Sequence, residues 1–93
     1  MEYSIMPQSH LYETERFEGS HKHHIFGAYN RNKSEEYGLF VYLTPEMHNM
    51  SNKGVHFNRA FDLQLKRIAQ ATAMEYYDWS MSDWLLLFGK NYL

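Results

Sequence analysis

The histidines are the residues of this chain best suited to chemistry. Three of the six lie in the stretch HKHH at positions 21–24, and two more, His48 and His56, follow downstream. A neutral imidazole binds divalent metals, and because it titrates near working pH it also serves as a general base. The chain contains no cysteine, which excludes disulfides and thiolate zinc sites. A metal would therefore be held by His, Asp, Glu, Asn or water.

The segments around these histidines follow the order strand, loop, strand, short helix. The predicted elements are a strand at His23–Phe26, a polar loop over 27–38 with one helical turn from Ser34, a strand at Leu39–Leu43, and a short helix from Pro45 that carries His48. We expect the strands to pair antiparallel, which brings His23 and His24 toward His48 and His56. Adjacent strand residues point to opposite faces, so a shared site requires a bend, which Gly27 makes easy.

Two longer helices are predicted after this region. Asn58 is a suitable N-cap for a helix over Arg59–Tyr77, and a last helix from Ser80 or Ser82 runs through Phe88 to a stop at Gly89. The first of these helices has one apolar face, with Gln70 among the polar residues turned away from it. Residues 1–20 show no sustained period and predict an extended arm or a short strand. The order of elements predicts an α+β fold in one domain spanning residues 1–93.

The composition is that of an ordered globule, with 44% hydrophobic and 17% aromatic residues and a net charge of -2. No apolar run approaches the roughly 20 residues of a membrane span, and no signal peptide is predicted, so we expect a cytoplasmic protein without a membrane partner. The expected core is centred on Phe26, Leu39, Val41, Leu43, Phe61, Leu65 and Ile68.

The histidine pattern favours one arrangement, in which three imidazoles hold a divalent ion and a fourth beside them acts as a base. Taken singly, His10 and His21 are expected at the surface, and His48 and His56 as ordinary helix and loop residues. Basic residues outnumber acids over positions 31–33 and 53–67. This bias is compatible with phosphate contacts and equally with a solvated surface of mixed charge.

A family resemblance covers most of the chain, from Thr14 to Leu93. It is carried by the segments HHIFGAYNR, SEEYGLFVYL, HNMSNKGVHFN, FDLQLKRIAQ and FGKNYL, taken in this order. Together they resemble a family of small phage and prophage HNH endonucleases of the His-Me finger class. In that class a β-hairpin and a helix grip one divalent metal and cut DNA. The resemblance implies a ββα-metal core over residues 21–58, an N-terminal arm over 1–20 and additional C-terminal helices over 59–93.

The resemblance also implies roles for individual residues. His24 corresponds to the general base, and His23, His48 and His56 correspond to the metal ligands. The implied activity is hydrolysis of DNA phosphodiester bonds with Mg²⁺ or Mn²⁺, while a three-histidine site also suits Zn²⁺ or Ni²⁺. The expected partners are DNA, the metal, and a second copy of the chain or a larger phage complex. The residues expected to contact DNA phosphates are Arg31, Lys33 and Lys53.

The sequence departs from the family pattern in several places. The Cys-x-x-Cys knuckle of many members is missing, so the domain must be held together by its core. Thr44 stands near the position where many members carry a further Cys, and Met47 stands where a second His is common. The middle Asn of the HNH pattern is also not found where Tyr37 and Gly38 stand, so Asn30, Asn32 or another group must orient the catalytic histidine. A second interpretation therefore stays open, in which a degenerate HNH fold binds DNA or protein without cleaving.

Overall fold

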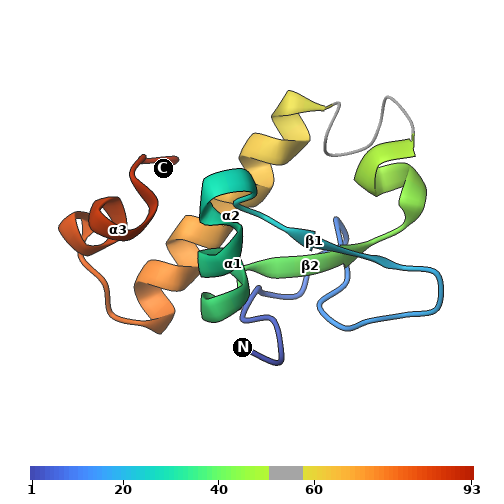
Figure 1. Cartoon of the computed structure of the whole chain (residues 1–93), viewed down its shortest axis with the longest axis horizontal. Helices are drawn as coiled ribbons and strands as arrows, with labels where there is room; N and C mark the ends of the chain where they lie inside the picture. The colour runs from blue at the N-terminus through green and yellow to red at the C-terminus, as the bar shows by residue number, and fades with distance from the viewer. Residues whose placement is uncertain (51–57) are drawn as a thin grey trace.

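The computed structural model describes residues 1–50 and 58–93, with Asn49 and Met50 described by their backbone alone. Its elements, in chain order, are β1 (His21–His24), the 3-10 helix η1 (Ala28–Asn30), α1 (Arg31–Tyr37), β2 (Phe40–Leu43), the π-helical η2 (Glu46–Met50), α2 (Arg59–Tyr76) and α3 (Met81–Phe88). Figure 1 shows the two strands side by side, with α1 at one end of the hairpin, η2 at the other and α3 beyond α2. The α+β class is confirmed.

The two strands form the antiparallel hairpin that the sequence predicts. His21 pairs with Leu43 and His24 pairs with Phe40. The first strand begins and ends two residues earlier than expected. Ile25 still donates its N–H to the carbonyl of Leu39 at 3.0 Å, but the backbone of Phe26 bonds to a side chain instead of the sheet. The strand therefore ends before Phe26, whose backbone is bonded by the Ser34 hydroxyl.

The N-terminal arm covers the edge of β2 that β1 leaves open. Glu13 and Tyr42 exchange two backbone hydrogen bonds, of 3.0 and 2.8 Å, and the N–H of Ile5 donates to the carbonyl of Gly38 at 2.9 Å. A sheet edge that is covered in this way is protected from pairing with other chains. Within residues 1–50 and 58–93, no segment pairs with the outer edge of β1, the strand that carries three of the histidines.

The connection between the strands is more helical than predicted. One turn was expected from Ser34, whereas η1 and α1 together run from Ala28 to Tyr37. Because the sequence of α1 is mostly polar, only Ser34 of its seven residues is buried. It ends at Gly38, whose φ of 76° is in the left-handed region that glycine adopts without strain.

The predicted helix caps in the C-terminal half are confirmed. The side chain of Asn58 accepts the backbone N–H of Phe61 at 3.0 Å and starts α2. Ser80 and Asp83 form a reciprocal capping box at the start of α3, which fixes the choice between Ser80 and Ser82. The helix ends at Gly89, with a φ of 81°.

The core lies between the hairpin and the C-terminal helices. Six of the seven predicted core residues are buried, while Ile68 is partly buried against them. The ring of Phe26 contacts Trp84 and Phe88, with centroid distances of 5.3 and 4.9 Å, and those two rings stack on each other at 4.2 Å. This aromatic cluster attaches the segment after the histidine strand to α3.

Gln70 corrects the predicted orientation of α2. It is fully buried, and its amide donates to Asn91 at 3.0 Å and accepts the backbone N–H of Tyr92 at 2.6 Å. Buried amides need such partners, so Gln70 belongs to the face that holds the C-terminal segment. Among the described residues, no helix has both the length and the hydropathy to cross a membrane.

Two glycines with nearly the same backbone conformation give a test of the arm's packing. A Cβ added at Gly38 would lie 3.1 Å from the carbonyl oxygen of Tyr3 and from Cγ2 of Ile5, whereas one at Gly89 would meet nothing within 4 Å. We expect Gly89→Ala to cost about 1–2 kcal/mol for the left-handed φ alone. Gly38→Ala should cost about 1 kcal/mol more, because it also overpacks the contact with the arm. Urea denaturation of both variants measures the difference, and equal losses would show that the arm does not resist displacement.

Candidate functional site

The alternation of β1 divides its side chains between two faces. His21 and His23 lie on one face and Lys22 and His24 on the other, as the strand pleat requires. His23 is the most buried of the four, with 4% of its surface exposed. Among the described residues, β1 pairs only with β2. A hollow of about 250 Å³ is lined by Lys22, His23, His24, Gly27, Ala28, Arg31 and His48.

The histidine cluster brings His48 from η2 against β1. The ring of His48 lies 5.2 Å from that of His23 and 5.2 Å from that of His21, measured between centroids. The Nδ1 atoms of His21 and His48 are 3.0 Å apart, so one of them donates and the other accepts. His21 was expected at the surface, but it is partly buried and belongs to this cluster. The reason is the strand period, which places it on the same face as His23.

The donor types in this cluster suit a divalent metal, although the described atoms do not close a site. Within residues 1–50 and 58–93, no three His, Asp or Glu side chains are placed to hold one ion. His56, the remaining predicted ligand, lies outside the described residues, as does Lys53.

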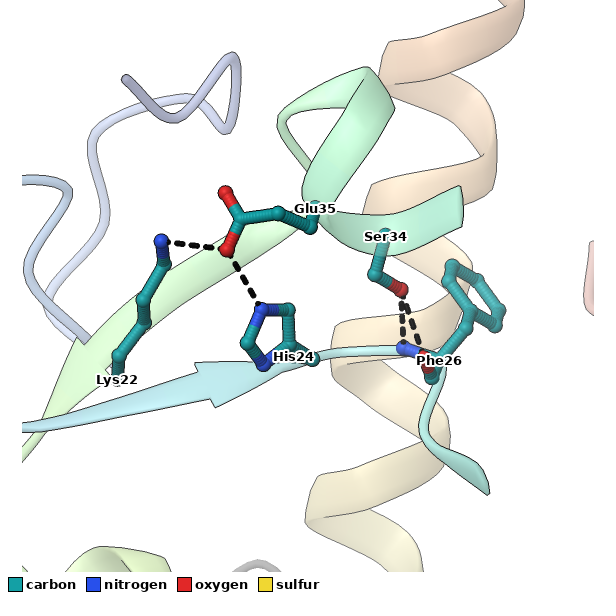
Figure 2. A network of polar contacts seen from close by, with 5 residues as sticks. All are labelled: Lys22, His24, Phe26, Ser34 and Glu35. Atoms are coloured by element: carbon teal, nitrogen blue, oxygen red, sulfur yellow. Dashed lines mark hydrogen bonds and ion pairs between the residues drawn. The ribbon is translucent and has the colours of Figure 1, made fainter. Parts of the chain in front are cut away.

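His24 on the opposite face is held by a carboxylate from α1. Its Nε2 lies 2.9 Å from Oε1 of Glu35, and the same oxygen accepts a hydrogen bond of 2.7 Å from the Lys22 ammonium (Figure 2). The hydrogen bond from Lys22, and after it that from His24, lowers the pKa of the Glu35 carboxyl against the opposing effect of burial. The small stabilisation that these exposed contacts contribute is therefore present at pH values above the ordinary pKa of a carboxyl. It is lost as the pH falls through the lowered pKa of Glu35.

Ser34 is the group that fixes the backbone beside His24. Its hydroxyl donates to the carbonyl of Phe26 at 2.8 Å and accepts the N–H of Phe26 at 3.0 Å, as Figure 2 shows. Asn30, one of the two asparagines considered for such a role, donates instead to the carbonyl of Phe88 at 3.2 Å, and Asn32 is exposed. Among these polar residues, Ser34 is the one whose side chain binds the backbone near His24, through Phe26 two positions after that histidine.

Of the residues predicted to contact phosphates, Arg31 lies beside the histidines and Lys33 lies against α3. Arg31 lines the hollow beside the histidines. Lys33 donates to the carbonyl of Leu87 near the end of α3, and its ammonium lies 5.8 Å from the ring centre of Tyr29. Of the two described residues, Arg31 is the one that a bound phosphate at the histidines would meet.

Sequence reasoning did not single out Glu35 or Ser34. Both stand in the polar segment SEEY, where the pattern predicts a polar loop with one helical turn. The available signal is indirect. A helix that connects two paired strands folds back over the hairpin, so its residues can reach the end of β1. Choosing which of them do so requires the rotation of α1, which its polar sequence does not specify.

Comparisons of the chain with protein-family models, with curated proteins and with solved structures find no match.

The double hydrogen bond of Ser34 predicts a measurable loss of stability. Ser34→Ala leaves the buried N–H and carbonyl of Phe26 without this side-chain partner, which should lower the free energy of unfolding by about 1–3 kcal/mol. Ser82→Ala is the matched control, because Ser82 is exposed on α3 and should change stability by less than about 0.5 kcal/mol. Urea denaturation compares the two, and an equally small effect at Ser34 would contradict its anchoring role.

Proposed function

We propose that this chain is a metal-dependent endonuclease of the HNH type, which hydrolyses DNA phosphodiester bonds and is phage-encoded. The observation that carries the proposal is the composition of one hollow. A histidine pair from a strand, a histidine from the helical segment after the hairpin, and an arginine from the connecting helix line the same 250 Å³ space. This order of strand, strand and helix is the one that a ββα-metal core would have, with β1, β2 and η2 as its elements.

Within this proposal, His23, His48 and His56 are the residues that would hold a divalent ion. The contact between His21 and His48 fixes the ring orientation of His48, as the outer partners of metal-binding histidines commonly do. When bound, Mg²⁺ or Mn²⁺ supplies Lewis-acid stabilisation of negative charge on the phosphate and on the leaving oxygen.

His24 takes the proton from the attacking water. General bases are recognised first by geometry, and His24 lines the hollow while lying on a different face of β1 from His23. It is thus separated from the metal-side histidines and is free to accept a proton rather than to ligate. Arg31 binds the phosphate that is cut, or its neighbour, and so positions the DNA backbone against the base.

Plasmid nicking tests the proposal. Supercoiled DNA incubated with the protein and Mg²⁺ or Mn²⁺ should be converted to the open circular form, because one active site cuts one strand. EDTA should abolish this conversion. His24→Ala should reduce the nicking rate by at least about 100-fold, the lower range of a general base's contribution, while metal binding measured by calorimetry is retained.

The matched control is His10→Ala, which removes an exposed histidine of the N-terminal arm outside the hollow and should nick at the wild-type rate. Metal binding without cleavage by the wild-type protein would overturn the nuclease and favour the degenerate binding module. Equal rates in the His24 and His10 variants would overturn the assignment of the base.

The salt dependence of DNA binding tests the contribution of Arg31. In a His24→Ala background, which binds without cutting, Arg31→Ala should lower the slope of log affinity against log salt by about 0.9, the value of one phosphate contact on B-DNA. Arg67→Ala removes an equal charge from an exposed position on α2 and should leave the slope unchanged. Equal changes in the two variants would mean that net charge, and not a local phosphate contact, determines affinity.

A further inference from the structure

The carboxylate of Glu35 is aimed at the ring that the proposed reaction uses as its base. Glu35 lies on α1, eleven positions after His24, and its Oε1 is 2.9 Å from His24 Nε2. Only 12% of the His24 side chain is exposed. The ring therefore has little freedom to choose another orientation, and its one described hydrogen bond goes to Glu35.

This contact decides which nitrogen of His24 can accept a proton. An ionised carboxylate has no hydrogen to donate, so Nε2 must carry the ring proton for the bond to form. In the neutral ring the acceptor is then Nδ1. A base must present a lone pair to its substrate. Because Nε2 faces the Glu35 carboxylate, Nδ1 is the nitrogen whose lone pair points away from it.

We propose that Glu35 is a positioning residue for His24, which it holds through Nε2 so that Nδ1 receives the proton of the attacking water. This inference rests on the proposed nuclease activity. Glu35 does not touch the DNA or the water in this scheme. It acts on the reaction through the tautomer and the orientation of the imidazole.

Glu35 is itself held in place from two sides. The Lys22 ammonium donates to the same Oε1 at 2.7 Å and lies 4.0 Å from the ring centre of Phe40. The preceding residue, Ser34, binds the backbone of Phe26 and thereby fixes α1 against the end of β1 (Figure 2). Lys22 also balances the charge of the carboxylate, which reduces its repulsion of an approaching phosphate.

If Glu35 had only a structural role, its substitution would change the stability of the fold more than the reaction rate. The Glu35 side chain is 41% exposed and that of Lys22 is 34% exposed, and pairs at such exposure contribute little to stability. Glu35→Gln is therefore expected to fold normally, with an unfolding midpoint close to that of the wild-type protein. An effect on the reaction would then have to come from the contact with His24.

The experiment compares Glu35→Gln with Glu36→Gln, which changes the neighbouring, exposed glutamate by the same substitution. Single-turnover nicking at saturating protein should slow by roughly 10–100-fold in Glu35→Gln, with unchanged affinity for DNA and for the metal. Glu36→Gln should keep the wild-type rate. A second measurement uses ¹⁵N-labelled protein, in which the Nε2–H of His24 should give a downfield proton resonance that His24→Ala removes, that Glu35→Gln shifts or loses, and that Glu36→Gln leaves unchanged.

The outcomes separate this inference from the proposed function. Wild-type nicking that Glu35→Gln does not slow would overturn the role of Glu35 and leave the nuclease standing. Slower nicking together with an unchanged Nε2–H resonance would also overturn it, because the loss would not act through His24. Failure of the wild-type protein to nick at all would overturn the nuclease, and with it any role of Glu35 in the reaction.

Discussion

Phe26 joins the histidine strand to the rest of the molecule through both its backbone and its ring. Its N–H and carbonyl are bonded by Ser34, and its ring lies in the aromatic cluster with Trp84 and Phe88. A strand at a sheet edge has few partners of its own, so its end would fray without such anchors. The position of His24 depends on this residue, because only Ile25 separates the two.

The strand pleat then gives the site two sides with different chemistry. His21, His23 and His48 form a side lined with imidazole nitrogens, a donor type that divalent metals bind. His24, Glu35 and Lys22 form a side in which a charged network orders one imidazole. In the proposed nuclease, a base on the same face as the ligands would compete with them for the ion. Histidines from both sides line one hollow.

Local sequence signals predicted the parts of this fold that local physics controls. The pairing of the strands, the cap at Asn58 and the stop at Gly89 follow from patterns a few residues long, and all three are present. The types and the spacing of the histidines also predicted that His48 would lie close to His23, and the two rings are in contact. Gln70, Ser34 and Glu35 were not predictable in this way, because the sequence marks each of them only as a polar helical residue. Their partners lie 8 to 22 positions away, and the rotation of each helix decides whether they meet.

The charge of the hollow bears on the choice between cleavage and simple binding. A surface that only binds DNA gains from positive charge, and the chain as a whole carries a net charge of -2. In the proposed nuclease, the charge of Glu35 would oppose phosphate binding, and its partner Lys22 offsets that charge. A hydrolytic site would gain from the pair, because an ordered, partly buried imidazole with a fixed tautomer favours proton transfer from water.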